Sequence, residues 1–239
     1  MGLTHSPRIV TDGLVLCLDA ASSRSYPGTG TTWTDLAGGN NATLTNGPVF
    51  GHEEGGIITT DGSDDSIDFP ISSVLQPVNV TAGIWAKTDG TSSYKPIFCV
   101  DDGRYNDYGI TIKDGGGGRY IGIQLNTNSG YINGSSSDST YDLETDYGSL
   151  TDILTTQFNY ILISYDGTTG KIFFNGEEKK SITSGIGGNI EYPNVLQIAI
   201  GSDHNTNFGA SVASFHIYNR ALTANEILQN YLATRGRFA

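Results

Sequence analysis

The sequence is short of cysteine and has no long apolar run, and each shortage excludes a class of protein. Two cysteines in 239 residues, Cys17 and Cys99, do not make a disulfide-stabilised scaffold. Both lie in apolar, strand-like runs, which leaves two alternatives: buried free thiols, or a single disulfide if the two strands are neighbours. Nowhere do about 18 apolar residues run together, so the sequence predicts no transmembrane helix.

Positive charge is also scarce. The chain has 13 Lys and Arg against 25 Asp and Glu, a formal net charge of −12. Such a field repels phosphate backbones and anionic lipid, so we expect neither nucleic acid nor a membrane as a partner. The opening M-G-L-T-H-S-P-R-I-V lacks the basic region and apolar run of a secretory signal peptide. We therefore expect the protein to be made and assembled in the cytoplasm.

Motifs for familiar catalytic chemistry are absent as well. No P-loop, zinc-ligand spacing or dinucleotide fingerprint occurs, and the four histidines are scattered. The run of four glycines at 115–118 lacks the Lys and the following helix that phosphate binding requires. The sequence therefore predicts a protein that is not an enzyme.

What the sequence does have is a succession of short apolar runs separated by turn residues. Gly contributes 32 residues, and clusters of Asn, Asp, Ser and Thr separate the runs. The expected strands are 14–18, 56–60, 66–69, 80–86, 97–100, 108–112, 120–125, 160–165, 171–174, 195–200 and 212–218. Glycine-rich or Asp-Gly and Asn-Gly turns after Ile112, Tyr165 and Phe174 predict three hairpins. About a dozen antiparallel strands must bury one face against another layer, which predicts an all-β, two-sheet sandwich.

One helix is expected near the C-terminus. Thr223 and Glu226 have the spacing of a capping box, and an apolar stripe follows them. Residues 127–156 carry almost no apolar periodicity, so we expect a long loop that is functional or forms an interaction surface. No convincing linker divides the chain, and we expect a single domain over 1–239 with its core at about 8–235.

Three phrases resemble a known family. They are G-L-V-L-C-L-D-A near the start, T-T-D-G-S-D-D-S-I-D-F in the first third and S-F-H-I-Y-N-R-A-L-T-A-N-E-I near the end. Together they resemble the laminin G-like, concanavalin A-like jelly roll, of the kind found in virion proteins of tailed phages. The resemblance covers nearly the whole chain and implies a β-sandwich with a short C-terminal helix. It leaves the ligand open, because this scaffold hosts lectins, hydrolases, receptor domains and structural proteins.

The resemblance and the missing export signal together favour a non-enzymatic virion structural or decoration protein. Its partners would be other virion proteins of the capsid or tail, with self-association as a homo-oligomer, and its location the virion. The alternative is a calcium-dependent, lectin-like carbohydrate-binding module that recognises a host surface polysaccharide. The two functions do not exclude each other.

Calcium is the cofactor that the family resemblance implies. The ion takes six to eight oxygen ligands, and family members hold it at the rim of the sandwich. The residues matching the acidic phrases are Asp61, Asp64, Asp65 and Asp203, and Asp19 at the end of the first strand is a further candidate. The alternative is that these aspartates stabilise turns by hydrogen bonds to their own backbone.

Tyrosines are the candidate contacts for a ligand or partner. Interleaved with Ser, Gly and Asn, tyrosine gives the composition of adaptable binding surfaces. The candidates are Tyr94, Tyr105, Tyr108, Tyr131, Tyr141 and Tyr147. Tyrosine is also a favoured strand residue, so packing in the sheets is the competing interpretation. Trp33 and Trp85 are expected in the core.

One phrase resembles the catalytic strand of concanavalin-type β-glucanases, Glu-x-Asp-x-x-Glu. Here Glu144 and Asp146 match, but Ser149 replaces the second glutamate. Two carboxylates about 5 Å apart are needed for a retaining hydrolysis. The substitution therefore argues against glycosidase activity.

Overall fold

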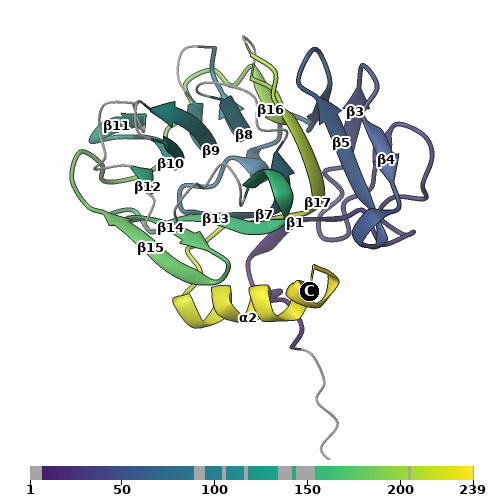
Figure 1. The fold of residues 1–239 in the computed structure, drawn as a ribbon. Coiled ribbons are helices and arrows are strands. Elements are labelled where there is room, and N and C mark those ends of the chain that lie inside the picture. The colour runs from purple at the N-terminus through teal and green to yellow at the C-terminus, as the bar shows by residue number, and fades with distance from the viewer. Residues whose placement is uncertain are drawn as a thin grey trace, which may run out of the picture.

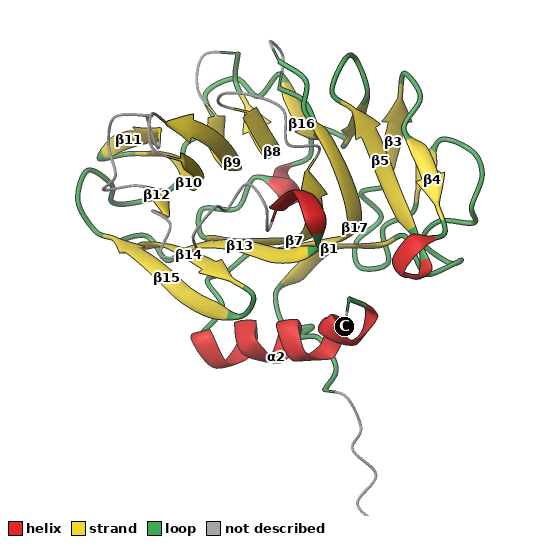
Figure 2. Ribbon diagram, viewed as in Figure 1, coloured by secondary structure: helices red, strands yellow, loops and turns green. Residues whose placement is uncertain are grey.

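The computed structural model describes residues 7–88, 95–103, 106–115, 118–133, 142–143, 154–203 and 206–238. Within them the chain forms two antiparallel sheets that face each other as a sandwich, with a helix packed on its outside (Figure 1, Figure 2). The expected fold class, an all-β jelly-roll sandwich with one short C-terminal helix, is confirmed. No helix among the described residues is long and apolar enough to cross a membrane.

Eight strands make up the first sheet, called sheet A below. In spatial order they are β15 (Glu177–Ile182), β14 (Gly170–Phe174), β13 (Asn159–Tyr165), β7 (Val80–Thr88), β17 (Gly209–Tyr218), β5 (Ile57–Asp61) and β4 (Val49–Gly51), and β1 (Leu14–Asp19) also pairs with β17.

Nine strands make up the second sheet, called sheet B. In spatial order they are β11 (Gly130–Asn133), β10 (Gly118–Thr127), β9 (Asn106–Gly115), β8 (Lys95–Asp101), β16 (Gln197–Ile200), β6 (Ser66–Asp68), β3 (Ala42–Thr45) and β2 (Thr32–Trp33), and β12 (Asp142–Leu143) also pairs with β10.

Sheet A is apolar on both faces, and strand β13 shows why. Its side chains alternate: Ile161, Ile163 and Tyr165 enter the core between the two sheets, whereas Tyr160 and Leu162 enter a second apolar cluster on the outer face. All seven residues of β13 are buried. A strand covered on both faces reads as a continuous apolar run, which is why the sequence pattern locates it so clearly.

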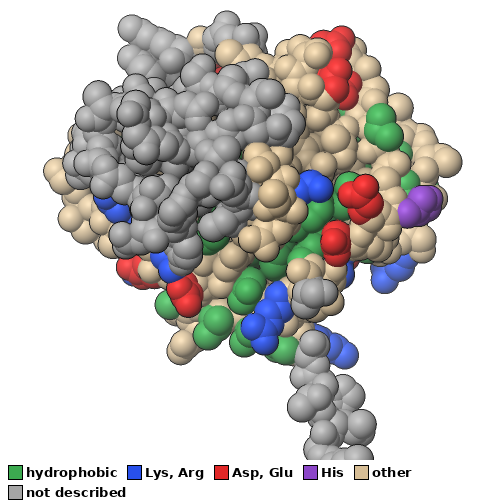
Figure 3. Space-filling view, in the orientation of Figure 1, with side chains coloured by type: hydrophobic (Ala, Val, Ile, Leu, Met, Phe, Trp, Pro, Cys, Tyr) green, Lys and Arg blue, Asp and Glu red, His purple; other side chains and the backbone are tan. Residues whose placement is uncertain are grey.

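Helix α2 (Ala224–Thr234) covers that outer face. Thr223 and Glu226 form the expected capping box, and Ile227 is fully buried in the outer cluster. The helix lies against sheet A on the side away from sheet B (Figure 1). It continues into the short 3₁₀ helix η3 (Arg235–Arg237). Apolar and basic side chains lie side by side on the surface in this region (Figure 3).

A closed set of three hydrogen bonds attaches the helix to the sheet. The backbone N–H of Val10 donates to Asn230 Oδ1 at 2.8 Å, Asn230 Nδ2 donates to the Tyr218 hydroxyl at 3.0 Å, and that hydroxyl donates to the Val10 carbonyl at 2.9 Å. Because all three residues are buried, each bond satisfies a polar group that water does not reach. The N-terminal segment, β17 and α2 are thereby fixed together.

The three expected hairpins are present. Strands β9 and β10 pair from Gly115 with Gly118, and β13 pairs with β14 across the Asp-Gly turn. Between β14 and β15, Asn175 and Gly176 have φ of 52° and 85°. Two consecutive left-handed residues make the tight turn that matches the twist of a hairpin, and Asn-Gly adopts it most easily.

Other expectations need correction. Residues 127–156 are not one long loop, because β11 and β12 both pair with β10 and the turn at 128–129 closes a hairpin. Strands β2, β3, β4 and β15 were not expected from the sequence. Strand β15 is an edge strand that begins E-E-K-K, and such charged residues hide a strand from pattern analysis while protecting the sheet edge.

The cysteine and tryptophan alternatives are resolved. Cys17 and Cys99 are both free and buried, on β1 of sheet A and β8 of sheet B respectively, so they do not pair. Trp33 is fully buried in the core between the sheets. Trp85 is buried in the outer cluster, where its indole N–H donates to the Thr234 hydroxyl at 2.7 Å.

Replacing Asn230 tests the attachment of the helix. Asn230→Ala leaves the Val10 N–H without its acceptor and removes the bond to the Tyr218 hydroxyl, so we expect a loss of about 2–3 kcal/mol in unfolding free energy. Leu228→Ala, at an exposed position of the same helix, is the control and should cost under about 1 kcal/mol. Urea denaturation measures both, and equal losses would show that the three bonds do not hold the helix.

Candidate functional site

The outer face of sheet B, unlike the part of sheet A that helix α2 covers, is polar. On β9, Tyr108 and Ile110 enter the core, so Asp107 and Thr111 point the opposite way. On the neighbouring β10 the same alternation turns Gln124 and Asn126 outward. The central strands of this sheet therefore present carboxylate and amide side chains on the face that turns away from the core.

Asp107 is the most unusual group on this face. Its side chain has an exposed fraction of 0%. Asn126 Nδ2 donates to Asp107 Oδ1 at 3.1 Å, but Oδ2 has no hydrogen-bond partner among the described residues. Burial, and to a smaller extent the neighbouring charges of Asp102 and Asp101, raise the pKa of Asp107 to about 7. A buried carboxylate oxygen without a donor costs stability and points to a ligand.

Further polar side chains extend the row across β16 and β6. Gln197 Nε2 donates to Asp68 Oδ1 at 2.9 Å, and the Ser66 hydroxyl donates to Asp68 Oδ2 at 2.8 Å. Asp68, Gln197 and Asn126 are each partly exposed. The row, called the polar face below, consists of Asp68, Gln197, Asp101, Asp107, Gln124 and Asn126.

The buried thiol of Cys99 lies on β8, between the core residues Phe98 and Val100, and so points to the same side of sheet B as the polar face. Burial, together with the negative charges of Asp203, Asp101, Asp107 and Asp68, raises the pKa of Cys99 well above its ordinary value. Three of these aspartates, Asp68, Asp101 and Asp107, belong to the polar face, whereas Asp203 lies in the loop before β17. Carboxylates accept hydrogen bonds and amides both donate and accept, which is the set needed to bind several hydroxyl groups at once.

A second group of carboxylates lies at the rim, where the chain passes from β5 of sheet A to β6 of sheet B. One oxygen each from Asp61, Asp64 and Asp65 lies within 4.8 Å of the others, the sole such group of three or more metal-binding side chains in the described ranges. Burial and the charges of Asp61 and Asp64 raise the pKa of Asp65. The structure thus places three of the five candidate ligands close together.

The same residues also make the turn bonds of the alternative interpretation. The Ser63 N–H donates to Asp61 Oδ1 at 2.8 Å, which lowers the pKa of Asp61, and the Asp61 N–H donates to Asp65 Oδ2 at 3.1 Å. The carbonyls of Ser63 and Asp64 accept from Asn207 and Asn46 side chains. The group therefore fits calcium in ligand type, but it supplies fewer than the six to eight oxygens the ion prefers.

Two of the candidate ligands lie elsewhere. Asp19 does not join the rim group, because alternation on β1 turns its side chain to the outer face of sheet A, where Oδ1 pairs with Arg237 Nη1 at 2.6 Å. Asp203 lies in the loop before β17, and its Oδ1 accepts from the Thr206 N–H at 2.7 Å. The Asn207 bond to Ser63 brings that loop alongside the rim group, but Asp203 is not one of the three converging carboxylates.

The tyrosine candidates have different outcomes. Tyr108 is a correction: it is fully buried in the core, where its hydroxyl donates to the Leu75 carbonyl at 2.8 Å and its ring packs on Phe98. Tyr131 is partly exposed on β11 and remains a candidate. Tyr94, Tyr105, Tyr141 and Tyr147 lie outside the described residues, as do Glu144, Asp146 and Ser149 of the glucanase-like phrase.

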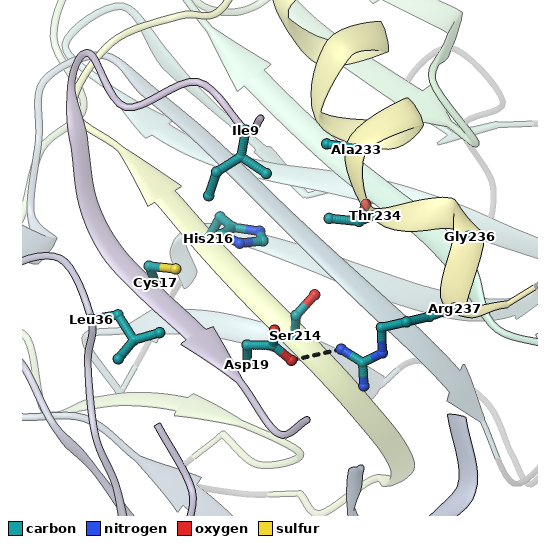
Figure 4. Close-up of a pocket in the computed structure, with 10 residues that line it drawn as sticks. All are labelled: Ile9, Cys17, Asp19, Leu36, Ser214, His216, Ala233, Thr234, Gly236 and Arg237. Carbon is teal, nitrogen blue, oxygen red and sulfur yellow. Dashed lines mark hydrogen bonds and ion pairs between the residues drawn. The ribbon is translucent and has the colours of Figure 1, made fainter. Parts of the chain in front are cut away.

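A pocket of about 340 Å³ lies on the other side of the molecule, between the outer face of sheet A and the C-terminal segment (Figure 4). Cys17 and His216 are directly opposite each other on β1 and β17, and Asp19 and Ser214 form the next outward pair. Burial lowers the pKa of His216 to about 4, and burial together with Asp19 and Asp35 raises that of Cys17 to about 12. Both side chains are therefore uncharged at neutral pH.

Comparison with known families identifies the scaffold. The model of the concanavalin A-like lectin/glucanases superfamily, in its laminin G form, matches residues 61–228. The chain belongs to this superfamily. No curated protein sequence matches it.

Solved structures share the superfamily fold. Domain 4 of AbnA, an extracellular arabinanase from Geobacillus stearothermophilus in complex with arabinotriose, superposes with a TM-score of 0.67 at 16% identity, covering 94% of this chain and all of that domain. Trypanosoma rangeli sialidase in complex with sialic acid gives 0.65 at 13% identity, covering 99% of this chain. This chain spans 37% of the sialidase. At these identities the likeness establishes the fold.

The polar face was not identified from the sequence, although its signal was present. Strand β9 reads N-D-Y-G-I-T-I, in which a core assignment for Tyr108 places Asp107 on the opposite face. Tyr108 was instead a candidate for a binding surface, with packing in the sheets as the alternative, and Asp107 beside it was not among the candidates. Within the concanavalin A-like superfamily, the chain thus presents two acidic regions, the rim group and the polar face.

Asp107 should make stability depend on pH. A carboxyl whose pKa is raised by folding stabilises the protein at low pH, and that contribution is lost as the pH rises from about 4 through about 7. We expect the unfolding free energy of Asp107→Asn, relative to wild type, to increase by about 3–4 kcal/mol between about pH 4 and pH 8. Groups that titrate in both proteins cancel in this difference.

Glu53→Gln is the matched control, because it removes one negative charge at an exposed position. Urea denaturation at a series of pH values measures both variants. A difference between Asp107→Asn and wild type that stays constant with pH, or equals that of the control, would show that the carboxyl is not held in its neutral form.

Calcium binding at the rim group stays a prediction. After chelation of residual metal, we expect calcium to raise the melting temperature, because a ligand held only by the folded state stabilises it. Asp64→Asn should raise the calcium concentration needed for the same rise in melting temperature at least tenfold. Asp64 supplies a converging oxygen, whereas Asp61 and Asp65 keep the turn bonds. Magnesium, which prefers a smaller octahedral site, is the control ion. Absence of any shift or heat at millimolar calcium would leave the turn interpretation.

Proposed function

We propose that this protein is a lectin-like module that binds carbohydrate on the polar face of sheet B. The observation that carries the proposal is Asp107, whose buried Oδ2 has no hydrogen-bond donor among the described residues. Because Asp107 is fully buried, a sugar hydroxyl would donate to that oxygen after the surrounding side chains move aside. Charge-assisted hydrogen bonds of this kind are stronger than those between neutral groups.

The neighbouring side chains support the same ligand class. Asn126 lies against Asp107, and Gln197 lies against Asp68, so amide donors and carboxylate acceptors alternate along the face. Vicinal hydroxyls of a sugar ring both donate and accept hydrogen bonds, and they match such alternation better than an apolar or purely anionic ligand does. The partly exposed members, Asp68, Gln197 and Asn126, would meet the glycan first.

The charge of the face indicates a neutral glycan. Three of its six members are aspartates, and the whole chain carries −12. A sulfated, uronic or sialic acid residue would be repelled by both fields. We therefore propose that neutral oligosaccharides bind and that anionic ones do not.

Similarity to carbohydrate-active proteins supports this function better than it supports a virion role. The arabinanase domain that shares the fold is described in complex with arabinotriose, and the superfamily is one of lectins and glucanases. We propose binding without hydrolysis, because Ser149 replaces the second carboxylate of the glucanase phrase. Incorporation into a virion, contact with capsid or tail proteins and homo-oligomer formation remain predictions from the sequence resemblance.

A glycan array followed by calorimetry tests the proposal. We expect binding to neutral oligosaccharides, and Asp107→Asn should raise the Kd of the best ligand by about tenfold to a hundredfold, the equivalent of one charge-assisted hydrogen bond. Glu53→Gln, which is exposed and remote from β9 in sequence, should leave the Kd unchanged. Misfolding does not confound this variant, because Asp107→Asn is expected to be more stable than wild type at neutral pH.

Three results would contradict the proposal or a part of it. Silence across neutral and anionic glycans, with and without calcium, would remove carbohydrate binding itself. Binding that Asp107→Asn leaves unchanged would move the site away from the polar face. A preference for anionic glycans would keep the function but overturn the ligand class.

A further inference from the structure

The pocket beneath the C-terminal segment has a chemistry that carbohydrate binding does not use. Its floor is the outer face of sheet A, and its wall includes Ala233, Thr234 and Arg237 from α2 and η3 (Figure 4). Cys17 and His216 lie side by side on the floor, as a directly opposed pair of antiparallel strands. The β-carbons of such a pair are about 5 Å apart, close enough for two side chains to reach one small ligand.

His216 is the group that indicates a ligand. Its exposed fraction is 4%, and its Nδ1 has no hydrogen-bond partner among the described residues. An imidazole nitrogen left in this state costs about 1–3 kcal/mol unless something occupies the pocket in front of it. The candidates are an ordered water molecule and a metal ion, because a neutral imidazole is a common metal ligand.

Cys17 and Asp19 favour the metal ion. Cys17 places a sulfur opposite His216, and in Figure 4 that sulfur is turned toward the imidazole. Asp19, the next outward residue of β1, uses Oδ1 for Arg237 and for the Ala21 N–H, whereas no described residue donates to Oδ2. Sulfur, imidazole nitrogen and carboxylate oxygen are each ligand atoms that zinc takes in proteins.

We propose that Cys17 and His216 bind a thiophilic divalent metal ion of the zinc class, with Asp19 Oδ2 and water completing a tetrahedral site. Binding converts the Cys17 thiol to a thiolate and releases its proton to solvent. The ion therefore gains an S–metal bond and an N–metal bond without any oxidation or reduction. The donor atoms of Cys17, His216 and Asp19 do not all lie within 4.8 Å of one another, as those of the rim group do. Asp19 therefore has to rotate toward the pair to complete the site.

The rim group and the pocket at Cys17 and His216 should then prefer different metal ions. The rim group offers only carboxylate oxygens, which suit calcium, whereas the pocket offers sulfur and nitrogen, which suit zinc. Cys99, the other free thiol, has no histidine opposite it: its cross-strand partners are Ala199 and Gly109. Cys99 is therefore a matched control within the same chain.

Cobalt titration tests the site, because cobalt replaces zinc and its thiolate complexes absorb in the near ultraviolet. We expect the wild-type protein and Cys99→Ser to develop a thiolate-to-cobalt band that zinc abolishes. Cys17→Ser should lose the band, and His216→Gln should weaken cobalt binding at least tenfold. No band in wild type, or a band that persists in Cys17→Ser, would overturn the proposal.

X-ray absorption of the zinc-loaded wild type gives a readout that needs no variant. We expect one sulfur at about 2.3 Å together with nitrogen and oxygen ligands at about 2.0–2.2 Å. A shell of oxygen alone would place zinc at the rim carboxylates and overturn the assignment to Cys17 and His216. This measurement stands whether or not the substituted proteins fold.

Discussion

The burial of both faces of sheet A is the constraint from which the rest of the structure follows. One face packs on sheet B, and the other is covered by α2, which the bonds among Val10, Tyr218 and Asn230 attach to β17. The outer face of sheet B carries polar side chains instead, of which Asp101, Asp107 and Gln124 are buried and the others are partly exposed. The position of the helix thus leaves a pocket on the outer face of sheet A and the polar face on sheet B.

On the polar face, Asp107 lowers the stability of the folded state and offers a carboxylate oxygen, unpaired among the described residues, to a ligand. An asparagine would fit the same volume and keep the bond from Asn126, yet the chain carries a carboxyl whose second oxygen has no described donor. Such a group raises the free energy of the folded state at neutral pH, where it is partly ionised. Residues that break the rule of buried polar pairing without local compensation are expected at functional sites. His216 on the opposite sheet is a second buried polar residue with an unpaired atom among the described residues.

Sequence reasoning located the fold well because the strongest patterns come from doubly buried strands such as β13 and from the capping box at Thr223. It missed β2, β3 and β4, which are two to four residues long, and β15, whose charges mask its strand pattern. For the sites, the short spacing in the sequence was enough to predict that Asp61, Asp64 and Asp65 lie close together. Spacing could not place Asp19, nor pair Cys17 with His216, because those positions depend on which strands become neighbours.

The aromatic side chains limit how tightly the polar face can hold a sugar. In many carbohydrate sites rings of the ligand pack on aromatic faces, but here Trp85 lies between Tyr160, Tyr231 and Phe238 at ring distances of 5.4, 5.8 and 4.1 Å, and Trp33 is enclosed in the core. On the polar face, Tyr131 lies directly opposite Asn126 and is partly exposed, so one aromatic ring lies beside a row of hydrogen-bonding groups. The net contribution of those groups is modest because water competes for them. A single site of this kind gives weak binding. Useful affinity for a repetitive polysaccharide then requires several copies acting together, since linking weak sites raises the overall affinity without any new contact. This requirement connects the proposed lectin function with the homo-oligomer expected from the sequence.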